Sequence, residues 1–164
     1  MALAVTHVIL VIVALDFFRH YILGKKKFPR YLIVLGGIAG LAPDLDVPLT
    51  WAYQFITGSS MSLHGLFTHT IFFPIFFLLV AGTLQFLQNK KWSSIFYVIS
   101  FGWFFHLTLD CLYGGYKSFL WPLNVPTSFC PQWGISPYAI SIDAIILIIW
   151  LVHEEMHHYI KDYF

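Results

Sequence analysis

The sequence predicts an all-α integral membrane protein, a compact bundle of about five transmembrane helices. Hydrophobic residues make up 59% of the 164 residues and charged residues only 10%, and the mean hydropathy is +0.75. So few polar side chains cannot cover the surface of a water-soluble globule. The apolar residues also form separate runs close to the length of a membrane-spanning helix, about 20 residues. No repeat or charged linker divides the chain, so we expect a single domain over residues 1–164.

Continuous apolar runs place most of the predicted helices. They cover residues 2–23, 66–87, 92–112 and 137–152. A further run, residues 31–42, stops at Pro43, because proline lacks the backbone N–H that a helix interior needs. Residues 49–56 extend this run towards the membrane interface. We therefore expect a second helix that is broken at its outer end.

The basic residues predict how the bundle is oriented, because lysine and arginine concentrate on the cytoplasmic side of a membrane. Two connections, residues 44–65 and 113–136, hold Lys117 as their single basic residue, so we assign them to the outside. The N-terminus is then outside and the C-terminus cytoplasmic. Most basic residues lie at the opposite ends of the runs: Lys25, Lys26, Lys27, Arg30, Lys90, Lys91 and Lys161.

Histidines and aspartates interrupt the apolar runs at one common depth. An ionisable side chain inside a membrane costs roughly 2.5–3.5 kcal/mol on insertion scales, so a cluster of them needs a partner that offsets this cost. A bound cation is the simplest such partner. At about 1.5 Å per helical residue, the candidate metal ligands all fall near the outer ends of their runs. They are His7, Asp44, Asp46, His64, His69, His106 and Asp110.

Two short spacings bring pairs of these ligands together. His106 and Asp110 are four residues apart, so they lie on one face of a helix and can bind the same ion. Pro43 ends its helix and leaves Asp44 and Asp46 on irregular backbone, where both carboxylates can turn towards one centre. Alternatively, Asp44 caps the N-terminus of a helix, although this role does not explain Asp46.

Other polar residues extend the predicted site. His64 lies in the loop before the run 66–87, and His69 lies in the first turn of that run. Asp143 lies about two turns into the last run from the outer side, where it can act as an extra ligand or a proton acceptor. Its alternatives are a bond to a backbone group or a pair with Lys117.

This ligand set predicts both the metal and the chemistry. Four imidazoles and three carboxylates exceed the needs of one ion and fit two divalent ions, with Zn²⁺ the first choice and Mn²⁺ or Fe²⁺ next. Such a pair stabilises both the attacking and the leaving oxygen of a displacement, which favours phosphoester hydrolysis. At head-group depth the expected substrate is amphiphilic, such as a phospholipid or a polyprenyl phosphate. We expect Asp46 and Asp143 to be the catalytic carboxylates.

Several motifs occur in the order typical of one family, at residues 6–7, 42–48, 64–70, 106–110 and 120–122. Together they resemble the YdjM-like (LexA-regulated) membrane-bound metal-dependent hydrolases, which implies a metal site and hydrolase activity. The histidine motif of that family usually reads His-Arg-Gly-x-Thr-His-Ser, whereas this chain has Gly65 in place of the arginine and Thr70 in place of the serine. If that arginine contacts an anionic substrate in the family, the contact is either missing in this chain or supplied by Lys117. Asp143 matches the acidic residue usual in the family's last span.

Rival classes of protein fit the sequence less well. A formal net charge of +1 gives no reason to expect a nucleic-acid partner. A metal or proton transporter needs polar groups through the full membrane depth, whereas only Asp16 lies well below the site, with Arg19 as its expected ion-pair partner. A non-catalytic metal-binding protein would saturate the coordination of its ion with four protein ligands, fewer than this chain offers. Cys111 and Cys130 lack the spacing of a zinc or thioredoxin-like motif, and whether they form a disulfide stays open.

Overall fold

The computed structural model describes residues 4–24, 27–65, 67–113, 119–123, 130–131 and 138–157. These residues form helices and connecting turns and contain no strand, so the all-α prediction is confirmed for the part of the chain described. The helices are α1 (Ala4–Phe18), α2 (Arg30–Leu41), α3 (Asp46–Thr57), α4 (Phe72–Phe86), α5 (Lys90–Leu112) and α6 (Ala139–His157).

Three helical stretches are long and apolar enough to cross a membrane, judged by length and composition. They are Ala4–Leu23, Arg30–Thr57 and Lys90–Leu112. Two further apolar helices, Phe72–Phe86 and Ala139–His153, are shorter than a full span. The helices therefore support a multi-pass membrane protein, while the count of five spans stays a prediction.

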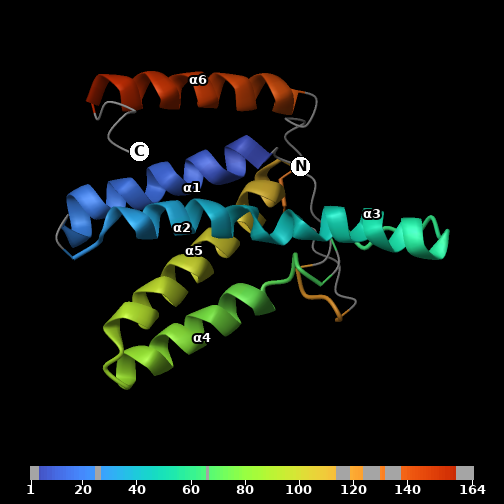
Figure 1. Ribbon diagram of the computed structural model, residues 1–164, viewed down its shortest axis with the longest axis horizontal. Helices are drawn as coiled ribbons and strands as arrows, with labels where there is room; N and C mark the ends of the chain where they lie inside the picture. The colour runs from blue at the N-terminus through green and yellow to red at the C-terminus, as the bar shows by residue number, and fades with distance from the viewer. Residues whose placement is uncertain are drawn as a thin grey trace.

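The expected break in the second helix is a single 3-10 turn rather than irregular chain. Residues Ala42–Leu45 form this turn between α2 and α3, with Pro43 in its first positions. Proline is tolerated there because the first residues of a helical segment have no intrahelical acceptor for their N–H groups. In Figure 1, α2 and α3 therefore follow each other along one line, and Asp46 begins α3.

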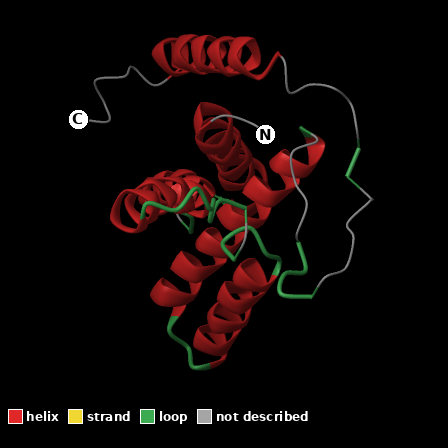
Figure 2. Ribbon diagram, turned by 90° about the vertical axis from the view of Figure 1, so that its right-hand side faces the viewer, coloured by secondary structure: helices red, strands yellow, loops and turns green. Residues whose placement is uncertain are grey.

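Helix α5 is the centre of the packing. Both α2 and α4 pack against it, α1 packs against α2, and α6 packs against α1. Figures 1 and 2 show α6 on one side of the molecule and the hairpin of α4 and α5 on the other. A π-helical segment, Arg19–Leu23, continues α1. Its first residue, Arg19, lies 3.5 Å from Asp16 as expected and donates to the Phe28 carbonyl oxygen at 3.0 Å. This contact joins the segment after α1 to the chain just before α2.

Glycines allow α2 and α5 to approach at backbone distance. A Cβ atom added at Gly102 would lie 2.6 Å from the Gly36 carbonyl oxygen and 2.9 Å from the Gly40 nitrogen. Only a residue without a side chain fits there, as is common where membrane helices cross closely. The approach brings His106, which follows Gly102 on α5, against Gly40 near the C-terminal end of α2.

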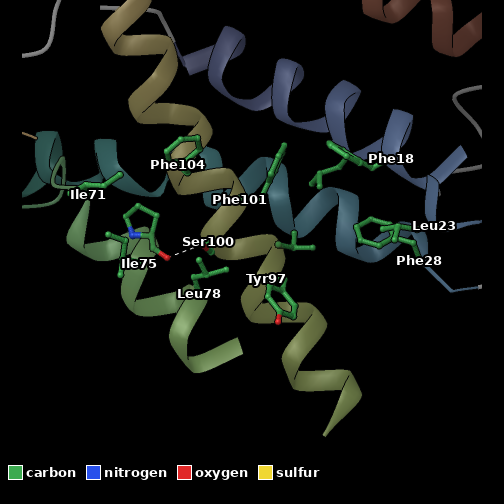
Figure 3. Close-up of a pocket in the computed structure, with 13 residues that line it drawn as sticks. Phe18, Leu23, Phe28, Ile71, Ile75, Leu78, Tyr97, Ser100, Phe101 and Phe104 are labelled. Carbon is green, nitrogen blue, oxygen red and sulfur yellow. Dashed lines mark hydrogen bonds between the residues drawn. The ribbon is translucent and has the colours of Figure 1, made fainter. Parts of the chain in front are cut away.

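An apolar cavity of about 630 Å³ lies on α5 between α4 and the end of α1 (Figure 3). Tyr97, Phe101 and Phe104 line its floor from α5. Phe104 and His106 are two residues apart on a helix, so their side chains point about 200° from each other. The cavity is therefore separate from the predicted metal site, and none of the candidate ligands lines it.

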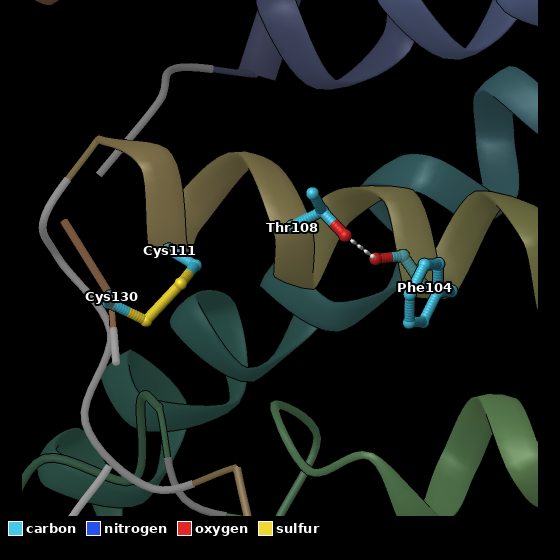
Figure 4. The surroundings of a disulfide bond; sticks show 4 residues. All are labelled: Phe104, Thr108, Cys111 and Cys130. Atoms are coloured by element: carbon cyan, nitrogen blue, oxygen red, sulfur yellow. Dashed lines mark hydrogen bonds between the residues drawn. A yellow bond between two sulfur atoms is a disulfide. The ribbon is translucent and has the colours of Figure 1, made fainter. Parts of the chain in front are cut away.

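A disulfide joins Cys111, in the last turn of α5, to Cys130 (Figure 4). The sequence left this pairing open. The bond ties the chain that follows α5 back to the C-terminal end of that helix, one residue beyond Asp110.

Candidate metal centre

Four separate segments deliver the candidate ligands to one place. His7 comes from α1, Asp44 from the 3-10 turn, His69 from the connection between α3 and α4, and His106 and Asp110 from α5. The last two lie on one face of α5, as their spacing predicts. All of these side chains are fully buried except Asp44, which is 20% exposed.

Four atoms form a compact set around a common centre: His69 Nε2, His106 Nε2, Asp44 Oδ1 and Asp110 Oδ2. The two imidazole nitrogens are 3.3 Å apart. Asp44 Oδ1 lies 3.5 Å from His69 Nε2 and 3.6 Å from His106 Nε2. Asp110 Oδ2 lies 3.7 and 3.6 Å from the same two nitrogens. A tetrahedral ion with bonds of about 2.0–2.2 Å holds its ligand atoms about 3.3–3.6 Å apart. The five distances above are close to this range, and we call these four atoms the tetrahedral set.

The tautomer of His106 supports this reading. Its Nδ1 lies 2.7 Å from the Gly40 carbonyl oxygen, and a carbonyl can only accept, so Nδ1 carries the proton. In the neutral imidazole the lone pair is then on Nε2, which faces the other three atoms. This fixed orientation is what a metal-binding histidine usually needs from its surroundings.

A second group of ligand atoms adjoins the first. The ring of His7 stacks on that of His106, with centroids 3.8 Å apart, and His7 Nε2 lies 3.4 Å from Asp110 Oδ1. Within the described part of the chain, both ring nitrogens of His7 and both oxygens of Asp110 are buried without a hydrogen-bond partner. Buried polar atoms are rarely left this way, so these atoms point to a ligand that they share.

Asp46 and His64 lie on the more open side of the cluster. The His64 side chain is 23% exposed, and its Nδ1 lies 2.7 Å from Asp46 Oδ1. This hydrogen bond raises the pKa of His64 above its ordinary value. Asp46 itself is fully buried, and hydrogen bonds from the protein occupy both of its oxygens.

The predicted ligands therefore separate into two groups whose ligand atoms lie within 4.8 Å of one another. The first contains His7, His106 and Asp110, and the second contains Asp44, His64 and His69. Of the seven predicted ligands, Asp46 falls in neither group.

Asp143, a further predicted site residue, falls in neither group of ligand atoms. Asp143 Oδ1 accepts hydrogen bonds from the backbone N–H of Thr6, at 2.8 Å, and from the Thr6 hydroxyl. It thus satisfies the N-terminus of α1 beside His7, which is the backbone role that the sequence left as an alternative. Lys117 lies outside the described residues.

Sequence reasoning missed two supporting groups. One is the Gly40 carbonyl, which fixes His106. The other is Thr68, whose hydroxyl donates to Asp46 and whose carbonyl accepts from Trp103 Nε1 at 2.8 Å. The Thr68 position adjoins His69 in the histidine motif, so that motif held a signal for it.

Comparison with known proteins identifies a family for this chain. Neither the curated proteins nor the solved structures contain a match to this chain. The model of one family, described as YdjM inner membrane protein, matches residues 1–161. The match covers nearly the whole chain, including every segment that contributes to the cluster. The chain is therefore a member of the YdjM inner membrane protein family.

Proposed function

We propose that this protein is a membrane-bound hydrolase that holds two divalent ions and cleaves a phosphoester bond of a lipid or similar amphiphile. The observation that carries the proposal is the position of Asp110 between two sets of ligand atoms. Its Oδ2 belongs to the tetrahedral set, while its Oδ1 faces His7. A single structural ion would be satisfied by the tetrahedral set alone and would leave His7 and Asp110 Oδ1 only their 3.4 Å contact with each other.

The donor atoms suggest how two ions would be shared. His69, His106, Asp44 and Asp110 would hold the first ion, with His64, which groups with Asp44 and His69, as a further ligand. His7 with the second oxygen of Asp110 would hold the other ion. Mixed nitrogen and oxygen donors suit Zn²⁺ first and Mn²⁺ or Fe²⁺ next. Such ions, when bound, supply Lewis acidity to a phosphoryl group and activate water for attack.

Burial indicates where a substrate would approach. The side chains of His7, His69, His106 and Asp110 are fully buried. Those of Asp44 and His64 remain 20% and 23% exposed. The entrance is therefore on the side of these two residues. In the proposed reaction the oxygen of water bonds to phosphorus, the bond to the leaving oxygen breaks, and that oxygen takes up a proton. The apolar surroundings favour a substrate whose chains stay in the membrane.

The disulfide supports the outer leaflet as the location. Disulfides form and persist in oxidising compartments, and Cys111 follows Asp110 directly. The ligand cluster and the disulfide thus share one end of α5. Together with the distribution of lysine and arginine, this favours an N-terminus outside and a C-terminus in the cytoplasm.

The proposal is tested by metal content and lipid turnover of the purified protein. Metal analysis of wild-type protein prepared without chelators should find up to two equivalents of Zn or Mn. Detergent-solubilised protein, incubated with mixed phospholipids and polyprenyl phosphates, should release phosphate or head group, and a chelator should stop the release. Asp110→Asn should remove most of both the metal and the turnover.

Asp16→Asn is the matched control, because Asp16 pairs with Arg19 away from the cluster. It should keep the metal and the turnover. Metal binding without turnover of any phosphoester would leave a non-catalytic metal-binding protein as the better interpretation. Loss of function in Asp16→Asn alone would favour a transporter.

A further inference from the structure

Asp46 is the most completely hydrogen-bonded side chain in the cluster. Its Oδ1 accepts from His64 Nδ1 at 2.7 Å. Its Oδ2 accepts from the Gly65 backbone N–H at 2.9 Å and the Thr68 hydroxyl at 2.7 Å, and lies 3.2 Å from His69 Nδ1. The carboxylate is fully buried. It therefore has little capacity left for a metal ion.

These contacts determine the tautomers of two histidines. A carboxylate only accepts hydrogen bonds, so the Nδ1 atom of His64 must carry its proton. His69 Nδ1 also lies 3.0 Å from the Thr68 hydroxyl, whose proton goes to Asp46. Both neighbours of His69 Nδ1 are then acceptors, so this atom carries its proton as well. In the neutral rings the lone pairs are then on Nε2. For His69 this is the atom that belongs to the tetrahedral set. Asp46 thus acts on the side of each ring opposite to the one that would bind metal.

We propose that Asp46 is a positioning residue that orients His64 and His69 through their Nδ1 atoms, and that it is not itself a metal ligand. This inference rests on the metal site of the proposed function. It replaces the ligand role that the sequence suggested for Asp46.

The surrounding structure holds Asp46 in place. Gly65 has φ of +77°, a backbone conformation that side chains other than glycine rarely adopt, and its N–H points at Asp46 Oδ2. Thr68 is anchored in turn by Trp103 of α5, whose Nε1 donates to the Thr68 carbonyl. Asp46, at the start of α3, is therefore connected directly to the loop that carries His64 and Thr68, and through Thr68 to α5.

The first experiment reads the tautomers directly in metal-free, full-length protein in detergent. Nitrogen-15 spectra of labelled histidine, recorded at a pH where the rings are neutral, should show His64 and His69 protonated at Nδ1. In Asp46→Asn, whose amide can accept at one atom only, at least one of the two rings should shift towards the Nε2–H form. If that variant does not fold, the wild-type spectrum is sufficient by itself, because wild-type rings protonated at Nε2 would overturn the inference.

The second experiment compares metal affinities. Titration with Zn²⁺ or Co²⁺ should give Asp46→Asn the same stoichiometry as wild type with affinity lowered about 10–100-fold, the usual effect of losing an outer-shell partner. Asp110→Asn should instead lose bound ions. If Asp46→Asn loses ions as completely as Asp110→Asn, Asp46 is a ligand and the inference is wrong. Absence of metal binding in wild type would contradict the proposed function. The tautomer experiment uses metal-free protein, so it would still test the positioning role of Asp46.

Discussion

Replacement of Gly102 by alanine should damage the metal site from a distance. The added Cβ would lie 2.6 Å from the Gly36 carbonyl oxygen, whereas ordinary contact begins at 3.4 Å. Because the obstacle is backbone on both helices, α2 and α5 must separate by about 0.8 Å or distort by a similar amount. Overpacking of this kind typically costs about 1–3 kcal/mol of stability.

The same displacement reaches His106, one turn beyond Gly102 on α5. Its bond to the Gly40 carbonyl oxygen is 2.7 Å long, and a separation of about 0.8 Å along that direction stretches it to about 3.5 Å, outside hydrogen-bonding range. The ring would lose the contact that fixes its tautomer. We therefore expect Gly102→Ala to lower zinc affinity about 10–100-fold as well as stability.

Gly82→Ala is the matched control, because a Cβ at Gly82 in α4 would meet nothing within 4 Å. It should keep zinc affinity and stabilise its helix by up to about 1 kcal/mol. Thermal unfolding in detergent and zinc titration of both variants provide the measurements. Unchanged affinity and unchanged unfolding temperature in Gly102→Ala would refute the link between helix approach and site.

Three further predictions concern the intact protein. Metal affinity should fall as the pH is lowered, beginning above pH 6.5, because Asp46 raises the pKa of His64 and protons then compete for its ring; a binding curve that is flat from pH 8 to pH 6 would contradict this. Removal of metal by a chelator should lower the unfolding temperature, since ions at about 1,000 times their Kd stabilise the folded state by about 4 kcal/mol. In Cys111→Ser, an impermeant thiol reagent should label Cys130 in intact cells, and labelling only after permeabilisation would reverse the orientation.

The composition of the site was predictable because it depends on depth and helical spacing. His7, His106 and Asp110 lie in apolar runs whose bounds can be read from hydropathy, so their common level follows from residue counting. The four-residue spacing of His106 and Asp110 fixes their shared face in any helix. These features are local or depend on the membrane, and neither requires knowledge of the tertiary contacts.

The division of roles among the carboxylates was not predictable, because it depends on which groups reach each oxygen. Asp44 and Asp46 are two residues apart, yet one faces the histidine Nε2 atoms and the other the Nδ1 atoms. That difference arises from the 3-10 turn and from the loop that carries His64. Asp143 likewise depends on how α6 lies against α1, which the apolar pattern of α6 does not specify.

The proline of the 3-10 turn has a consequence for how a histidine can be fixed inside a membrane. In hydrocarbon, helices use nearly all of their own carbonyl groups, so a side chain seldom finds a backbone acceptor. Gly40 lies in the last turn of α2, directly before the 3-10 turn, where pairing changes from the N–H four residues later to the N–H three residues later. Three residues after Gly40 is Pro43, which has no N–H, and the Gly40 oxygen accepts from His106 Nδ1. A residue usually regarded as a helix breaker thus lies beside an acceptor in a region of the protein where backbone acceptors are scarce.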